Sequence, residues 1–213
     1  MSFMDQQTAD EVKKRLSELA GEVKIVYFKE TMLCETCGPT EELYKELASL
    51  SPKVKLEVYN RVTDTEKASA YGIDKTPAAV IEGANGSRVR FYGIPAGYEF
   101  VSLLEALKNS VSASQDLQPE TVTALGGVAK PVNIKVFVTP SCPYCPGAVV
   151  MAHKFALVSP QITAEMVESS EFPQLADRYN VSGVPQIVVN DSITLVGLQP
   201  EPAMLKAVLD AAA

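Results

Sequence analysis

The chain has 213 residues, of which 46% are hydrophobic and 21% are charged, and its formal net charge at pH 7 is -7. A chain of this length forms one large domain or two domains of about 100 residues each. The negative charge argues against a nucleic-acid-binding protein, which presents a basic surface. No apolar run approaches the ~20 residues that span a bilayer, and the N-terminus has no signal-peptide pattern. We therefore expect a soluble, cytoplasmic protein.

The first half of the chain predicts helices and strands in a definite order. Helices are expected where apolar residues recur at three- and four-residue spacing, and strands where short runs are apolar or alternate. In chain order these elements are a helix over 10–20, a strand over 24–28, a helix that reaches 50, a strand over 54–59, a helix over 63–71, a hairpin of 78–81 with 88–92, and a closing helix over 98–108.

The second half repeats this order after a linker rich in Ser and Gln. The predicted elements are a helix over 119–125, a strand over 132–138, a helix from 142, a strand over 161–167, a helix over 171–179, strands over 186–190 and 193–196, and a last helix over 201–212. Alternation of strands with helices of this length is typical of an α/β fold.

A fixed offset relates the two halves. The cysteines and prolines of the first half lie 108 positions before their counterparts, as in Cys34 and Cys142, or Pro77 and Pro185, and the turn of the second hairpin is four residues shorter. Self-similarity at a fixed period indicates repeated structural units. We predict two units, residues 1–113 and 114–213, each with a mixed four-stranded sheet flanked by helices.

Each unit carries a Cys-x-x-Cys pair between a predicted strand and a predicted helix, and these pairs contain all four cysteines. The pattern is typical of a thioredoxin-like redox site. A cysteine at a helix N-terminus lies near free N–H groups and the positive end of the helix dipole, which stabilise its thiolate. The second thiol can then attack a mixed disulfide and release the substrate. This predicts Cys34 and Cys142 as exposed nucleophiles, and Cys37 and Cys145 as buried resolving thiols.

The residues between the cysteines differ. Glu35 places a carboxylate beside Cys34, whereas Pro143 and Tyr144 carry no charge. A neighbouring negative charge disfavours a thiolate, so we expect the pKa of the Cys34 thiol to be the higher one. A less stabilised thiolate makes a more reducing pair, and the hypothesis is that the second pair is the stronger oxidant.

Two other interpretations of the cysteines are weaker. A four-thiolate zinc site brings together pairs that lie about 15–20 residues apart in zinc ribbons, whereas a whole repeat separates these pairs, so we expect no metal. Purely structural bridges between such close cysteines would constrain the unfolded chain little.

The second pair belongs to a longer pattern. Cys142-Pro-Tyr-Cys145 followed by Gly183-Val-Pro-Gln-Ile187 resembles glutaredoxins, and two such units resemble the protein disulfide oxidoreductases of archaea and thermophilic bacteria. The resemblance implies a protein with two thioredoxin folds that oxidises and reduces protein disulfides. Whether it also isomerises them is left open. The resemblance implies redox-active disulfides without a bound cofactor, and NADPH acting indirectly through a flavoprotein reductase similar to thioredoxin reductase.

The resemblance also implies a role for two prolines. In this family the proline that faces the cysteine pair follows a cis peptide bond, and Thr76-Pro77 and Val184-Pro185 are the matching bonds. The residue before the proline would pair with an extended substrate. The alternative is a trans proline that begins an edge strand.

A third resemblance concerns two glutamates. The stretch Gly93-Ile-Pro-Ala-Gly-Tyr-Glu99 is similar to one in bacterial peroxiredoxin-reductase flavoproteins, where a glutamate of the first unit lies near the cysteines of the second. By that match Glu99 would tune a resolving thiol or accept its proton, as Glu35 would tune Cys34. Alignment of the last helices places Glu201 opposite Glu99. Alternatively, both are acids in a first helical turn, which is favourable by itself.

Two alternative functions stay open. The protein could be an electron carrier dedicated to a flavoprotein reductase and a peroxiredoxin, or a thioredoxin-fold binding or chaperone module with one idle cysteine pair. His153 is expected to be structural, since two helical turns separate it from Cys145, and Glu165 is expected at the surface of its strand.

Overall fold

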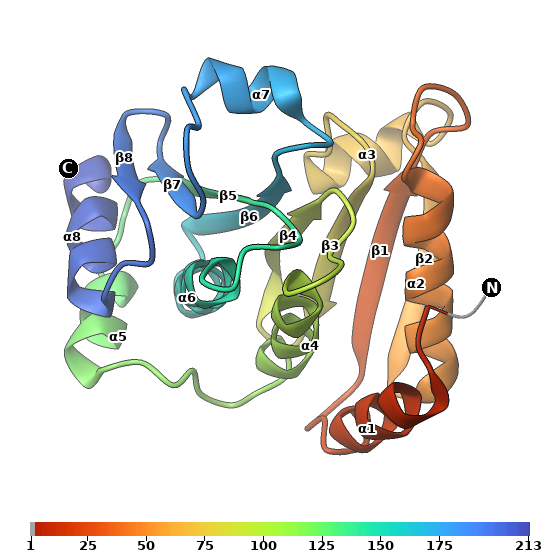
Figure 1. The fold of residues 1–213 in the computed structure, drawn as a ribbon. Coiled ribbons are helices and arrows are strands. Elements are labelled where there is room, and N and C mark those ends of the chain that lie inside the picture. Colours follow the sequence, from red (N-terminus) through yellow and green to blue (C-terminus); the bar gives the residue numbers. More distant parts are fainter. Residues whose placement is uncertain (1–2) are drawn as a thin grey trace.

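A computed structural model describes residues 3–213 and contains the predicted elements in both halves (Figure 1). The first half comprises α1 (Gln6–Ser17), β1 (Val23–Lys29), α2 (Cys37–Leu50), β2 (Val54–Asn60), α3 (Thr65–Tyr71), β3 (Ala78–Gly83), β4 (Gly86–Tyr92) and α4 (Glu99–Asn109). The second comprises α5 (Pro119–Gly126), β5 (Val132–Val138), α6 (Cys145–Val158), β6 (Ile162–Glu168), α7 (Pro173–Arg178), β7 (Gln186–Val189), β8 (Ile193–Val196) and α8 (Glu201–Ala212).

Element ends differ from prediction where a local interaction decides them. Helix α1 starts earlier than expected because the Asp5 side chain accepts a hydrogen bond from the N–H of Thr8 at 2.8 Å and so caps the helix. Helices α2 and α6 begin at the second cysteine of each pair, not at the first as expected. None of the helices in residues 3–213 has the length and apolar character of a membrane span.

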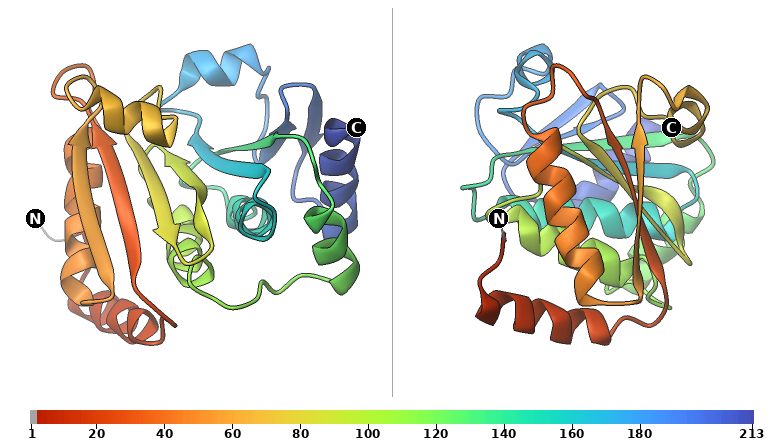
Figure 2. Two further views of the ribbon diagram at one scale, coloured as in Figure 1. Left: turned by 180° about the vertical axis from the view of Figure 1, so that it is seen from behind. Right: turned by 90° about the vertical axis from the view of Figure 1, so that its right-hand side faces the viewer.

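The strands form one eight-stranded sheet in the order β2-β1-β3-β4-β6-β5-β7-β8. Each half contributes four strands of mixed direction, as predicted. The halves join where β4 pairs with β6 in parallel, from Val89 opposite Ala164 to Tyr92 opposite Val167. The sheet therefore continues through the whole molecule, from β2 at one end to β8 near the C-terminus at the other (Figures 1 and 2).

The strand directions place both cysteine pairs at the same edge of this sheet. Strand β3 is antiparallel to β1 and to β4, while β4, β6 and β5 are parallel to one another. The carboxyl ends of β1, β4, β5 and β6 therefore meet at one edge. The loops that follow β1 and β5 carry the cysteines, and the loop that follows β6 leads to α7 at the same edge (Figure 1).

Helices α2 and α6 follow the two cysteine pairs but have different neighbours. Helix α2 packs on β2 and β1 near the end of the sheet, whereas α6 packs on β4, β5 and β6 and against α4. The central position of α6 explains why eight of its residues are buried, against five in α2. His153 of α6 is among them, while Lys45, its counterpart in the repeat, lies at the surface and pairs with Glu41 and Glu42.

The junction of the halves contains two buried ionisable side chains. Glu165 of β6 accepts a hydrogen bond from Asn133 at 2.8 Å and lies 3.5 Å from the Arg90 guanidinium of β4. The expectation that Glu165 lies at the surface was wrong, because β6 is an inner strand of the joined sheet. The His153 ring contacts the Phe91 ring edge-on at 5.0 Å, and the backbone of Arg90 lies next to the ring and opposes the effect of burial on its pKa. Burial lowers the pKa of His153 to about 3.

Candidate active sites

Both cysteine pairs form internal disulfides, Cys34 with Cys37 and Cys142 with Cys145. The Cα atoms within each pair are 5.4 Å and 5.5 Å apart. In each case the first cysteine lies in the loop after a strand, and the second is the first residue of a helix. The sulfurs therefore lie at the helix N-termini, where free backbone N–H groups and the helix dipole favour a thiolate.

Cys37 and Cys145, the expected resolving cysteines, are buried, as predicted. The backbone N–H of Glu30, just after β1, donates a hydrogen bond to the Cys37 sulfur at 3.5 Å. The hydroxyl of Tyr27 donates to the Cys37 carbonyl oxygen at 2.7 Å. These contacts hold Cys37 in place from the interior of the first unit.

The expected nucleophiles differ in exposure. Cys34 is half-buried, but Cys142 is only 8% exposed, so the expectation that Cys142 is exposed was wrong for the disulfide form. Its sulfur lies 3.7 Å from the carbonyl oxygen of Val184, and the proline loop therefore covers it. Tyr144, between the two cysteines, is 66% exposed, and its neighbour Pro143 is exposed as well.

The peptide bonds Thr76-Pro77 and Val184-Pro185 are both cis, as the resemblance implied. Val184 directly faces the second pair through its carbonyl group, and Thr76 and Pro77 share a cavity with Cys34. The carbonyl of each proline accepts a hydrogen bond from a glycine after the hairpin, Gly93 at 3.0 Å and Gly197 at 2.8 Å. Each proline loop is thus held by its own unit next to its own cysteine pair.

The first pair opens into a cavity of about 500 Å³ to which both units contribute. Its lining residues from the first unit are Leu33, Cys34, Glu35, Thr36, Thr76 and Pro77, and those from the second are Ser170, Glu171 and Pro173. Sequence analysis did not single out Glu171, because no motif surrounds it and the matching position of the first unit is Thr63. Knowledge that β4 pairs with β6 would have placed it at this edge.

Glu171 is held in place from two sides. One of its carboxylate oxygens, Oε2, accepts a hydrogen bond from the Thr36 hydroxyl, inside the first cysteine pair. The other, Oε1, accepts from the backbone N–H of Ile94 at 2.6 Å. Burial raises the pKa of Glu171 above its ordinary value, the hydrogen bonds from Thr36 and Ile94 oppose this, and the nearby charge of Glu168 adds to it.

Glu99 is the first residue of α4 and is almost completely buried. Its Oε2 accepts a hydrogen bond from Ser102 at 2.6 Å, and its Oε1 has no partner within residues 3–213. Burial, opposed by the bond from Ser102, raises the pKa of Glu99 to about 7. The N–H of the adjacent Tyr98 donates to the carbonyl oxygen of Pro140 at 3.0 Å. The start of α4 therefore packs against the loop that leads to Cys142.

The remaining candidates lie at the surface or elsewhere. Glu35 is exposed and lines the cavity beside Cys34. Glu201 accepts a hydrogen bond from the N–H of Gln118 at 2.9 Å and so ties the start of α8 to the start of α5. This contact involves neither cysteine pair.

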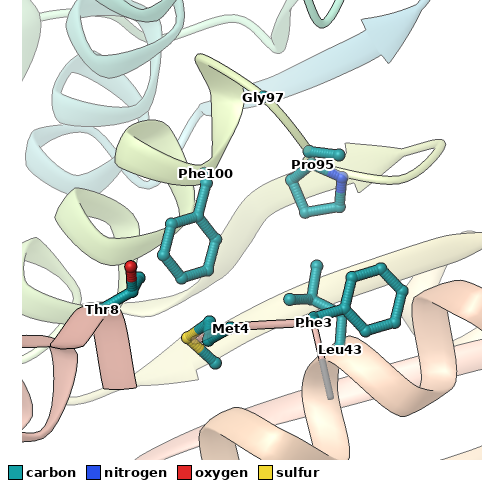
Figure 3. A pocket seen from close by; sticks show the side chains of 8 residues that line it. Phe3, Met4, Thr8, Leu43, Pro95, Gly97 and Phe100 are labelled. Atoms are coloured by element: carbon teal, nitrogen blue, oxygen red, sulfur yellow. The ribbon is translucent and has the colours of Figure 1, made fainter. Parts of the chain in front are cut away.

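A second cavity, of about 210 Å³, contains none of the predicted site residues. Figure 3 shows that Met4 and Phe100 face each other across part of this cavity, and that Leu43 of α2 and Pro95 lie on its other sides. The full lining is Phe3, Met4, Thr8, Leu43, Pro95, Ala96, Gly97 and Phe100. This apolar cavity lies beside the segment that leads into α4.

Comparison with known proteins gives consistent similarities. The family model "Thioredoxin domain" matches residues 21–105 and 132–210. The chain is similar to the crystal structure of a protein disulfide oxidoreductase from Aeropyrum pernix, with 34% identity, 98% of this chain and 93% of that chain covered, and a TM-score of 0.91. It is also similar to the NTD_N/C domain of the alkylhydroperoxide reductase AhpF from Enterococcus faecalis, with 27% identity, 97% and 100% covered, and a TM-score of 0.89.

The curated relatives are longer proteins. An alkyl hydroperoxide reductase component of Staphylococcus epidermidis and a Bacillus subtilis protein named NADH dehydrogenase are each 25% identical over 70% of this chain. The matched part is 27% of each relative, so the chain spans about a quarter of their length.

Proposed function

This chain belongs to the thioredoxin-domain family and contains two such domains, and we propose that it is a thiol–disulfide oxidoreductase that acts on protein disulfides. The observation that carries the proposal is the pairing of each internal disulfide with its own cis-proline loop at one edge of the sheet. The two functional units that we propose are residues 1–113 and 114–213.

The reaction follows from this arrangement. In the reduced protein the thiolate of Cys34 or Cys142 attacks a substrate disulfide and expels one substrate thiolate. The thiolate of Cys37 or Cys145 then attacks the mixed disulfide, closes the protein disulfide and releases the second substrate thiol. The backbone of Thr76 or Val184 is placed to pair with an extended substrate segment beside the sulfur. The reverse sequence oxidises a substrate dithiol.

The electron source that we propose is a flavoprotein reductase similar to thioredoxin reductase, with NADPH as the primary donor. The similarity to the AhpF domain, over nearly the whole chain, supports a partner of this kind. It also favours the second candidate function, a carrier between such a flavoprotein and a peroxiredoxin.

Trapping of mixed disulfides tests the function. Cys37→Ser and Cys145→Ser leave one nucleophile without its resolving thiol, so each variant should accumulate covalent adducts with substrate proteins. Cys34→Ser and Cys142→Ser serve as matched controls that should form none. The adducts are released with dithiothreitol and identified by mass spectrometry.

The adducts also separate the alternatives. Many different adducts indicate a general oxidoreductase, whereas a peroxiredoxin and a flavoprotein alone indicate a dedicated carrier. If one site forms no adducts, the cysteine pair of that site is idle and the proposal fails for that site. If neither site forms adducts, the proposal fails altogether and the protein is a binding module.

A further inference from the structure

We propose that Glu171, a residue of the second unit, is the proton-accepting carboxylate of the first cysteine pair. This inference deepens the oxidoreductase function proposed above and rests on it. It is carried by the position of Glu171 in the wall of the Cys34 cavity and by its hydrogen bond to Thr36, which lies between the two cysteines.

The segment that carries Glu171 is fixed in place at the junction of the two units. The carboxylate of Glu168, at the end of β6, accepts hydrogen bonds from the N–H groups of Ser170 at 3.1 Å and of Glu171 at 2.7 Å. The Phe172 ring packs edge-on against Tyr92 of β4, with ring centroids 6.2 Å apart. The backbone of Ile94 then binds the Glu171 carboxylate itself. The second unit thus supplies a built part of the first site.

The charge of Glu171 acts on the groups around Cys37. Burial is the largest cause that raises the pKa of Tyr27 of β1, and the negative charges of Glu41 and Glu171 add to it. Burial likewise raises the pKa of Tyr44 of α2, with contributions from Tyr27 and Glu171. The Tyr27 hydroxyl donates to the Cys37 carbonyl, so the charge of Glu171 acts on a side chain that is in direct contact with Cys37. The other ionisable groups that face Glu171 are Glu168 on its own segment and Cys34 and Glu35 in the shared cavity.

Two other glutamates near the first pair are already engaged. Glu41 of α2 pairs with Lys29 at 2.6 Å and Lys45 at 3.0 Å; burial opposes them, but these cations hold the pKa of Glu41 below its ordinary value. Glu30 accepts a hydrogen bond from the Arg61 Nε at 2.6 Å. A carboxylate bound by cations is a weak proton acceptor, whereas burial makes Glu171 a stronger one.

The proton transfer completes the reductive half of the reaction. The Cys34 thiolate attacks the substrate disulfide and expels a substrate thiolate. In the mixed disulfide, the carboxylate of Glu171 takes the proton of the Cys37 thiol, directly or through one water molecule. The Cys37 thiolate attacks the Cys34 sulfur and closes the disulfide. The second substrate thiolate leaves and takes the proton from Glu171, which returns to its ionised form.

The test isolates the first pair. Glu171→Gln is made in a Cys142→Ser/Cys145→Ser background, and single-turnover reduction of a synthetic peptide disulfide is followed from pH 5.5 to 9.5. Resolution of the mixed disulfide should slow at least tenfold near pH 6.5. The defect should disappear above about pH 9, where a thiol with the ordinary pKa of ~8.5 loses its proton unaided. Glu171→Asp should restore part of the rate at low pH.

Two controls accompany this variant. Asp177→Asn removes an exposed carboxylate from α7 of the same unit and should leave the pH profile unchanged. Glu171→Gln in a Cys34→Ser/Cys37→Ser background should leave the second pair at the rate of its parent. A merely structural role of Glu171 would slow the reaction equally at every pH, or at both pairs, and either result overturns the proposal.

If Glu171→Gln does not fold, Thr36→Val keeps the carboxylate but removes the hydroxyl that donates to it. The pKa of Glu171 should then rise, and the low-pH limb of the profile should shift to higher pH. An unshifted limb overturns the proposal. A failure of the oxidoreductase function itself looks different, because then the parent protein would form no mixed disulfide with the peptide at any pH.

Discussion

The two disulfides follow matching strands and precede matching helices, yet their surroundings differ. The first opens into a cavity that both units line, and its nucleophile, Cys34, is half-buried next to the exposed Glu35. In the second, the carbonyl of Val184 covers Cys142, and Tyr144 faces the solvent. Part of the difference lies in the residues between the cysteines, and part comes from the place of each unit in the shared sheet, which brings Glu171 to the first pair.

The junction at β4 and β6 breaks the equivalence of the units. It places α6 in the centre of the molecule, against α4, and leaves α2 near the end of the sheet. It also brings a glutamate of each unit toward the site of the other. Glu171 of the second unit contacts the first pair through Thr36, and Glu99 of the first unit lies behind the loop that leads to Cys142. The two cysteine pairs of the repeat therefore have different glutamates in their surroundings, Glu171 at the first pair and Glu99 behind the second.

The largest expected effect of this asymmetry is on acid stability. The pKa of His153 is about 3 in the fold and 6.5 in the unfolded chain, so the unfolded state binds the proton first. The contribution of neutral His153 to the free energy of unfolding is fully present above pH 6.5 and is lost as the pH decreases. The loss is about 3 kcal/mol at pH 4 and reaches about 5 kcal/mol below pH 3. His153→Leu should remove this loss, as measured by urea denaturation between pH 4 and pH 7.5.

The matched position of the first unit gives the control. Lys45 is exposed and keeps its charge throughout this range, so Lys45→Leu should leave the pH dependence of the free energy of unfolding as it is. Equal pH dependence in wild type and His153→Leu would mean that the junction admits a charged imidazole, and the contrast between α2 and α6 would lose its energetic meaning.

Glu99 should act in the opposite direction. Its pKa of about 7 in the fold exceeds the ordinary 4.5. Its contribution to stability is therefore complete below pH 4.5 and is lost as the pH rises through 7, which amounts to about 3 kcal/mol. Glu99→Gln should abolish this loss in urea denaturation. In a Cys34→Ser/Cys37→Ser background it should also abolish a limb near pH 7 in the turnover of the second pair.

Glu201, the repeat counterpart of Glu99, provides the comparison. It accepts a hydrogen bond from the N–H of Gln118, so Glu201→Gln should lower stability by about 1 kcal/mol at most. A pH dependence in Glu201→Gln that matches Glu99→Gln would show that a first-turn acid alone explains both residues.

Local sequence patterns predicted most of the structure within each unit. The spacing of apolar residues indicated the helices and strands, the repeat indicated two units, and the matched Cys-x-x-Cys pairs and prolines indicated both sites. These features depend on residues within one unit, and several are motifs with a direct physical reason. The cis bonds before Pro77 and Pro185 came from the family resemblance, since base rates alone favour trans.

The contacts between the units could not be predicted in the same way. No periodicity states that β4 pairs with β6, and this pairing is what buries Glu165, centres His153 and brings Glu171 to Thr36. The burial of Cys142 depends on a contact within one unit, the close approach of the loop with Val184 to the sulfur, which no local pattern predicts either. Such features follow from tertiary packing, and the side chains that report them carry no sequence signal of their own.

The reduction potentials should differ less than the stabilities. The second pair should be the stronger oxidant, because Glu35 and Glu171 both place negative charge near Cys34. Glu35→Gln should raise the potential of the first pair by about 20 mV, equivalent to about 1 kcal/mol. Because Glu35 is exposed, 1 M salt should screen most of this effect. The potentials are measured by equilibration with glutathione in proteins that keep one pair each, and a first pair that is equal or more oxidising rejects the comparison.

The smallest effect concerns the residue before each pair. Leu33 is fully exposed and has a φ of 62°. This left-handed conformation costs a non-glycine residue about 1–2 kcal/mol. Its counterpart Ser141 is not among the residues with positive φ. Leu33→Gly should raise the free energy of unfolding by about 0.5 kcal/mol, and Ser141→Gly should lower it by about as much, since glycine adds ~0.5–1 kcal/mol of unfolded-chain entropy at both positions. That entropy cancels in the difference between the two variants, which then reports the backbone conformation alone. Equal effects in urea denaturation would mean that the turns before Cys34 and Cys142 are equivalent, and that the asymmetry of the sites begins only at the cysteines.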